Sequence, residues 1–147
     1  MFQSANYKNP RKLLNSWEAQ ALATLAEKNL PNSFKAISEI MHDETRDIEI
    51  RTASEILFWG RVWRQSKTKE EVVTAWERIL ILTKHSDYQE IATSDEGRAS
   101  MEGFDERVDL PATERIQELT KEGLTPEEII MRGFSFEKVT EALKYDA

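Results

Sequence analysis

The chain of 147 residues contains no cysteine, which excludes disulfides, thiolate metal sites and a cysteine nucleophile. Its five glycines and four prolines are too few for a turn-rich β fold, and the scattered glycines form no phosphate-binding loop. No apolar run approaches the roughly 20 residues of a membrane span, and the N-terminus lacks one of signal-peptide length. These absences favour a soluble protein of the cytoplasm, or of the host cytoplasm if it is viral, with no membrane partner.

Acidic residues outnumber basic ones, 27 Asp and Glu against 20 Lys and Arg, for a net charge of −7. Such a balance disfavours indiscriminate binding to phosphate backbones. Residues 93–109 hold six acids and two arginines, so they carry −4 of the total. A local basic surface can therefore still exist elsewhere in the chain.

Apolar residues recur at helical spacing through most of the sequence, and no alternating pattern of a strand appears. We therefore predict an all-α protein. It has an N-terminal multi-helix bundle over 1–92, an acidic linker over 93–112, and a small C-terminal three-helix unit, similar to a helix-turn-helix, over 113–147. After an extended lead-in, the periodicity predicts helices in the first part of the chain over 16–28, from Asn32 or Ser33 to 41, over 46–63 and 69–85, and allows a short one over 88–92.

Capping residues predict where several of these helices begin. Thr68 with Glu71 forms a plausible capping box for the helix from Lys69. In the C-terminal unit we expect Thr113 to cap the first helix and Gly123 to close it. Thr125-Pro126-Glu127-Glu128 is a strong helix start, and Ser135 can cap a last helix whose inward stripe is Phe136, Val139 and Leu143.

The C-terminal unit has the size of a helix-turn-helix, and glycines separate its short helices as in that motif. In a helix-turn-helix the second helix of the pair enters the major groove. Val139 fits the apolar position after the turn glycine, Gly133. Ile129 is larger than the usual small residue, and Arg132 occupies a position that is normally apolar. The exposed face of the last helix would be charge-balanced: Glu137, Lys138, Glu141 and Lys144. A protein-docking module is therefore the alternative interpretation.

A second candidate site is the segment 56–69, which holds four cations and three aromatics with no acid. Cations there can neutralise phosphates, and an exposed aromatic ring can stack on a base. Trp59 and Trp63 are four residues apart and share one helix face, so burial in the core is the favoured interpretation for them.

Chemistry of other kinds has little support. The acids around His42-Asp43-Glu44 match no metal-binding loop, and a solvated turn is the better interpretation. No nucleophile, metal cage or cofactor loop is visible. We therefore expect a protein that is not an enzyme and uses no cofactor or metal.

Residues 32–57 resemble a helical pair of the phage small terminase subunits. The matching residues are Ala36-Ile37, Ile40-Met41 and Asp43-Glu44, followed by Arg51, Ala53 and Ile56-Leu57. The segment from Gly123, with Thr125-Pro126-Glu127-Glu128-Ile129 and later Ala142-Leu143-Lys144-Tyr145, is similar to the C-terminal helices of small antitoxin-like DNA-binding proteins.

The terminase resemblance implies a non-catalytic, ring-forming protein that recognises DNA at a packaging site and regulates a large ATPase subunit. Charge and position then select the nucleic-acid-binding candidates: Arg61, Arg64, Lys67, Lys69, Lys138 and Lys144. The net charge and the balanced last helix support a different hypothesis, a helical adaptor that binds a partner protein.

Overall fold

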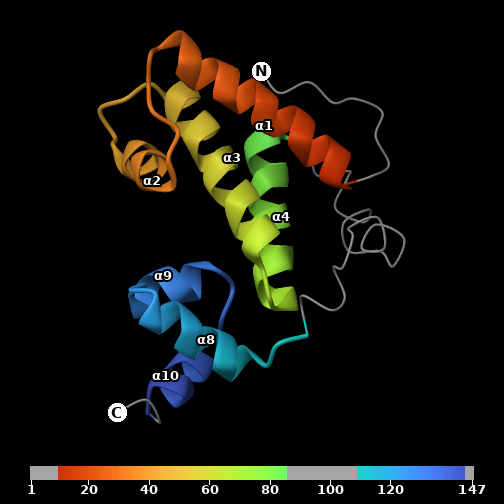
Figure 1. The fold of residues 1–147 in the computed structure, drawn as a ribbon, viewed down its shortest axis with the longest axis vertical. Helices are drawn as coiled ribbons and strands as arrows, with labels where there is room; N and C mark the ends of the chain where they lie inside the picture. Colours follow the sequence, from red (N-terminus) through yellow and green to blue (C-terminus); the bar gives the residue numbers. More distant parts are fainter. Residues whose placement is uncertain (1–9, 86–108, 145–147) are drawn as a thin grey trace.

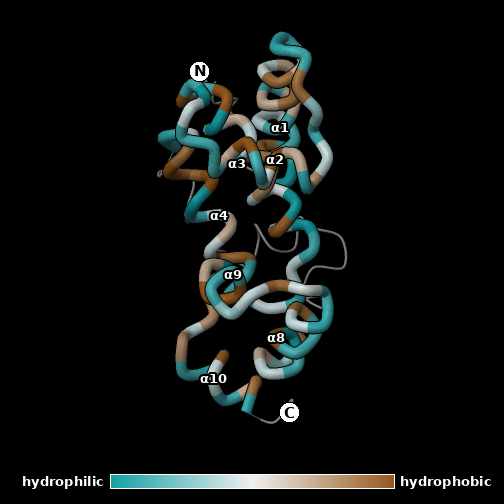
Figure 2. Tube along the Cα trace, turned by 90° about the vertical axis from the view of Figure 1, so that its left-hand side faces the viewer, coloured by the Kyte–Doolittle hydropathy of each residue, from teal (hydrophilic) through white to brown (hydrophobic). Residues whose placement is uncertain are grey.

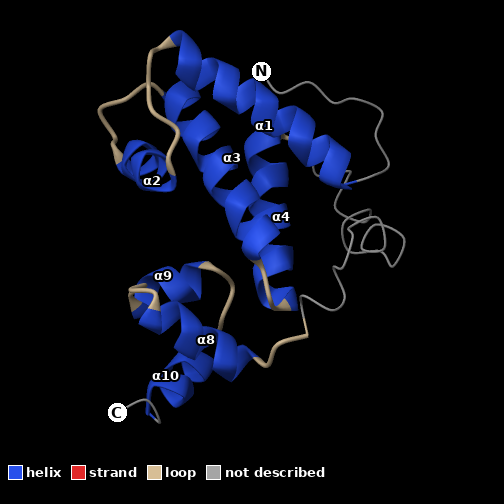
Figure 3. Cartoon of the chain, viewed as in Figure 1, coloured by secondary structure: helices blue, strands red, loops and turns tan. Residues whose placement is uncertain are grey.

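A computed structural model describes residues 10–85 and 109–144, and within these ranges the chain forms seven helices and no strand (Figures 1 and 3). The prediction of an all-α protein is confirmed for these residues. The helices are α1 (Pro10–Glu27), α2 (Phe34–His42), α3 (Ile48–Gln65), α4 (Lys69–Thr83), α8 (Ala112–Lys121), α9 (Pro126–Met131) and α10 (Phe136–Lys144). We call residues 10–85 the body and residues 109–144 the C-terminal unit. The predicted short helix at 88–92 and residues 93–108 of the predicted linker lie outside the described residues.

Helix α1 begins six residues earlier than the sequence predicted, so the extended lead-in is wrong for 10–15. Pro10 is tolerated in the first turn, where its missing N–H has no helical partner. Leu13 and Leu14 are buried together with Trp17, which extends the apolar stripe by a full turn. The helix ends as expected near Asn29, which has a φ of +54°, and the Leu30 N–H bonds to the Leu25 carbonyl at 3.0 Å.

The predicted caps of α2 and α4 are present. The Ser33 hydroxyl accepts a hydrogen bond from the Ala36 N–H at 3.2 Å, and the Thr68 hydroxyl accepts one from the Glu71 N–H at 3.4 Å. The return bond of the α4 cap is shifted by one residue, because the Glu71 carboxylate accepts from the Lys67 N–H at 3.1 Å. Glu71 therefore fixes the turn between α3 and α4 as well as the first turn of α4.

The body has α3 at its centre, packed against α1, α2 and α4. Trp76 of α4 lies between Trp17 of α1 and Trp63 of α3, with ring centroids 6.0 Å and 5.9 Å apart. Trp59 and Trp63 are both buried, so the prediction that they belong to the core is confirmed.

The C-terminal unit builds a separate apolar cluster from α8, α9 and α10. Its members are Ile116, Leu119, Ile129, Phe134, Val139 and Ala142. The capping box of Thr125 and Glu128 at the start of α9 is confirmed, as is the Ser135 cap, whose hydroxyl accepts from the Lys138 N–H at 3.2 Å.

Two expectations for this unit are wrong. Helix α8 begins at Ala112 with Pro111 at the cap position, so Thr113 does not cap it. Phe136 is 70% exposed rather than buried. Phe134, in the turn before α10, fills the core in its place, and Ala142 lies inward beside Val139.

Figures 1 and 2 show the C-terminal unit at the end of the body where α3 turns into α4, away from the end that α1 crosses. Hydrophobic and hydrophilic stretches alternate along the trace of both parts in Figure 2, as expected of amphipathic helices. The two apolar clusters share no residue. Across the described ranges, no helix has the length and apolar character needed to cross a membrane.

Candidate functional site

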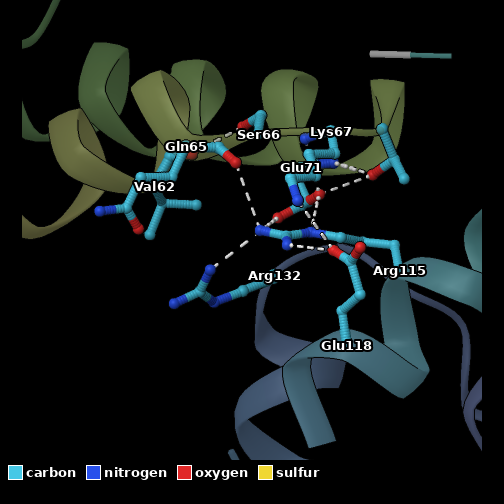
Figure 4. Close-up of polar contacts among 9 residues, drawn as sticks. Val62, Gln65, Ser66, Lys67, Glu71, Arg115, Glu118 and Arg132 are labelled. Atoms are coloured by element: carbon cyan, nitrogen blue, oxygen red, sulfur yellow. Dashed lines mark hydrogen bonds and ion pairs between the residues drawn. The ribbon is translucent and has the colours of Figure 1, made fainter. Parts of the chain in front are cut away.

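A fully buried carboxylate, that of Glu71, lies where the C-terminal unit meets the body (Figure 4). Arg115 of α8 binds it with two parallel bonds, Nε to Oε1 at 2.9 Å and Nη2 to Oε2 at 3.1 Å. A paired, bidentate geometry is the arrangement in which an arginine and a carboxylate interact most strongly. This pair joins two residues that are 44 positions apart in the sequence.

Arg115 uses its remaining donors as well. Its Nη1 donates to Glu118 Oε1 at 3.0 Å, and Nη2 also approaches the Gln65 carbonyl at 3.3 Å. Burial by itself lowers the pKa of Arg115, but the hydrogen bonds and charges of Glu71 and Glu118 outweigh it, and the pKa is raised. Its charge is therefore well compensated.

Arg132, at the end of α9, is buried on the other side of the same carboxylate. Its Nη1 lies 3.8 Å from Glu71 Oε2, too far for a hydrogen bond. Burial lowers the pKa of Arg132, and the attraction of Glu71 offsets this only in part because Arg115 repels it. The Glu71 carboxylate thus forms a close, hydrogen-bonded ion pair with Arg115 and a longer ion pair with Arg132.

Further polar contacts surround this group. Lys67 Nζ lies 3.1 Å from Glu118 Oε1, Lys138 Nζ lies 3.5 Å from Glu70 Oε2, and the Leu110 N–H donates to the Lys67 carbonyl at 3.2 Å. The hydrogen bond from Lys67, and then that from Arg115, lowers the pKa of Glu118. We call the whole set the junction: Gln65, Lys67, Glu70, Glu71, Arg115, Glu118, Arg132 and Lys138.

The backbone also makes close contact at the junction. Gly133 has a φ of +109°, and a Cβ added there would lie 2.7 Å from the Glu70 carbonyl oxygen and would overlap the Thr74 hydroxyl. Gly123 has a similar φ of +99°, yet nothing lies within 4 Å of its added Cβ. Only Gly133 is therefore required by the contact with α4.

Two predicted nucleic-acid-binding residues, Arg61 and Arg64, make structural contacts within the body. Arg61 Nη2 donates to the Asn32 carbonyl at 2.5 Å. Arg64 pairs with Glu18 of α1 at 2.8 Å and also bonds the Asn15 side chain. Burial raises the pKa of Glu18, and Arg64 opposes that rise.

The other four candidates fall into two settings. Lys67 and Lys138 belong to the junction and face acids there. Lys69 and Lys144 are exposed, and within the described residues neither forms an ion pair. The six residues therefore lie in three different environments.

The sequence drew attention to Arg132, because a cation stood where an apolar residue is usual, but it gave no sign of a partner. For Glu71 the sequence predicts only a capping role. Nothing in the local pattern distinguished Arg115 from the other charged residues of an amphipathic helix.

The outer face of α10 is a second feature of the C-terminal unit. Phe136, Glu137, Thr140, Glu141 and Lys144 line an open pocket of about 420 Å³. Phe136 is 70% exposed, and it is the most exposed aromatic side chain among the large exposed apolar residues of the described ranges.

No protein-family model matches the chain, and neither a curated protein nor a solved structure shows significant similarity to it. Among residues 10–85 and 109–144, no three His, Asp or Glu side chains gather as a metal site would require.

Proposed function

We propose that this protein is a helical adaptor that binds a partner protein through the outer face of α10. The observation that carries the proposal is Phe136, a 70% exposed aromatic side chain that lines an open pocket together with Glu137, Thr140, Glu141 and Lys144. Exposed aromatic anchors surrounded by polar residues are typical of the energetically dominant centre of protein interfaces.

The charges of α10 support a protein partner over nucleic acid. Its outward-facing side chains include Glu137 and Glu141 as well as Lys138 and Lys144, so they are balanced. Lys138 is further occupied by Glu70. A helix that enters a DNA groove gains most of its affinity by neutralising phosphates, and this face offers little net positive charge for that.

The test compares two substitutions of exposed apolar residues. The full chain is used as bait with and without nuclease, and Phe136→Ala is compared with Ile81→Ala, which removes another exposed side chain from the last turn of α4. A defined protein retained by the wild type and Ile81→Ala, lost by Phe136→Ala and indifferent to nuclease is the expected result. Capture that disappears with nuclease, or that survives Phe136→Ala, contradicts the proposal.

A second candidate is a small-terminase-like, viral DNA-binding adaptor that assembles into an oligomer and regulates a large ATPase subunit. Two observations favour it: α9 and α10 are joined by a short turn with Gly133 at a positive φ, and Lys69 and Lys144 are exposed cations. Salt-sensitive duplex binding, weakened by Lys69→Glu with Lys144→Glu, would support it. The absence of binding to any duplex at low salt would contradict this second candidate. Light scattering would give the oligomeric state.

A further inference from the structure

The junction differs from the rest of the protein in its chemistry. The body and the C-terminal unit each enclose their own apolar cluster, and several ion pairs and hydrogen bonds connect the two parts. Release of the unit would therefore divide neither apolar cluster. A polar contact between two self-contained parts is a suitable place for a reversible change.

The charges of the two surfaces are complementary. The body contributes two acids, Glu70 and Glu71, and one cation, Lys67. The C-terminal unit contributes three cations and one acid: Arg115, Arg132, Lys138 and Glu118. Glu71 is central because it is the only acid among these that is completely buried, and both buried arginines depend on it.

A buried ion pair adds little net stability, because desolvation of the charges opposes their attraction. Loss of one partner is costly, since the remaining charge is left buried without compensation. If Glu71 loses its charge, Arg132 loses its one ion-pair partner among the described residues and Arg115 keeps only Glu118. Both arginines are relieved when the C-terminal unit moves into solvent.

We propose that Glu71 with Arg115 is a charge latch that holds the C-terminal unit on the body beside the buried Arg132, and that the unit undocks as a folded whole when the latch is broken. Docking also occupies Lys67 and Lys138 with acids of the opposite part. Undocking therefore frees both lysines, together with the first turn of α4. The latch controls which polar surface the protein presents to a partner.

The absence of cysteine makes a direct measurement possible. Spin labels at Lys35→Cys in α2 and Thr140→Cys in α10, both exposed positions, report the distance between body and C-terminal unit. The wild-type background should give one narrow distance distribution. Glu71→Gln retains the oxygen that accepts from the Lys67 N–H but removes the charge, and it should give a broad distribution shifted to longer distances.

A second pair of variants tests the same proposal without changing a charge. Gly133→Ala should undock the unit by overlap with α4, whereas Gly123→Ala, which has a similar φ and free space, should leave it docked. All four tryptophans, at positions 17, 59, 63 and 76, lie in the body, so their fluorescence shows whether the body remains folded. If Glu71→Gln unfolds the body, the distance distribution of Gly133→Ala decides whether the C-terminal unit can undock as a folded whole.

Three results would overturn the latch. They are a narrow, unchanged distribution in folded Glu71→Gln, undocking by Gly123→Ala as extensive as that by Gly133→Ala, and a broad distribution already present in the wild-type background. None of these depends on whether α10 binds a protein or DNA.

Discussion

The backbone of Gly133 lies directly against the side chain of Thr74, so that a Cβ at position 133 would overlap the threonine hydroxyl. This contact joins the α9–α10 turn to α4 in a way that no residue but glycine permits. The same position also needs a positive φ, of +109°. The positive φ and the close contact therefore both require glycine at position 133.

Alanine substitutions at Gly123 and Gly133 should separate the effect of the positive φ from the effect of the close contact with α4. Each substitution places a Cβ in a strained conformation at a cost of about 1–3 kcal/mol. Only Gly133→Ala adds the overlap with Thr74 and the Glu70 carbonyl. We expect hydrogen exchange at the first turn of α4 to increase in Gly133→Ala beyond its value in Gly123→Ala, and equal exchange in the two would show that the close contact has no influence on docking.

The two buried arginines should respond in opposite ways to replacement by methionine. Arg115→Met removes the bidentate partner of Glu71 and leaves that carboxylate poorly compensated, which should weaken docking by roughly 3–5 kcal/mol. Arg132→Met removes a cation whose pKa is already lowered by burial, and an apolar side chain of similar length should be neutral or stabilising there.

Chemical denaturation followed by an amide-exchange probe in α8 measures both effects. Equal losses of protection in Arg115→Met and Arg132→Met would mean that Glu71 holds the two arginines equally well, against the difference between their distances of 2.9 Å and 3.8 Å.

Acid should loosen the junction through Glu118. Its pKa is lowered in the folded protein, first by the hydrogen bond from Lys67 and then by that from Arg115. A carboxyl with a lowered pKa contributes stability above its ordinary pKa, and that contribution is lost as the pH falls through the lowered value. The docked fraction should therefore decrease below the ordinary titration range of a glutamate.

The matched variant is Glu118→Gln, which cannot titrate and should lose this part of the pH dependence. The distance between the labels at positions 35 and 140, measured as a function of pH, provides the readout. A wild-type curve that coincides with the Glu118→Gln curve would assign the acid response to other carboxyls.

The packing of α1 on α3 gives a further test. Here the effect of one substitution on the stability of the body should change from destabilising to stabilising with the background. A Cβ at Gly60 would collide with the Glu18 carboxylate and displace it from Arg64. Gly60→Ala should destabilise the body by roughly 1–2 kcal/mol, because overpacking exceeds the gain of about 1 kcal/mol that alanine has over glycine in a helix.

In a Glu18→Ala background the obstacle is gone, and Gly60→Ala should become stabilising by up to about 1 kcal/mol. Thermal unfolding of the four proteins, followed by tryptophan fluorescence, completes the cycle. A Gly60→Ala effect that is the same in both backgrounds would show that Glu18 does not set the separation of the helices.

The sequence predicts correctly those features of the fold that depend on residues close together in the chain. Capping by Ser33, Thr68, Thr125 and Ser135 is decided within three positions of the chain. The last three caps are predicted correctly, and for α2 the sequence leaves Asn32 and Ser33 as alternatives. The burial of Trp59 and Trp63 likewise followed from their spacing on one helix. Phe136 was placed in the core wrongly, because periodicity defines the face of a helix but not whether a residue before the helix, here Phe134, already fills the space.

The junction could not be predicted, for a physical reason. Glu71 and Arg115 belong to residue types that are normally solvated, and they meet only because the chain returns after 44 positions to the start of α4. Arg132 was noticed as an exception to an expected apolar position, and the exception marked a real constraint. The prediction of a DNA-binding role for Arg61, Arg64, Lys67 and Lys138 considered charge along the chain, whereas the folded protein sets an acid or a carbonyl against each of them.

The separate apolar clusters also determine how undocking would register in a calorimeter. Heat-capacity change and denaturant sensitivity both follow the area exposed, and apolar area raises the heat capacity. Because charged groups make up much of the junction, its opening should produce a smaller heat-capacity step than the melting of either apolar cluster. The protein can thus exchange one surface for another without melting either apolar cluster, and a melting curve alone would pass over the event.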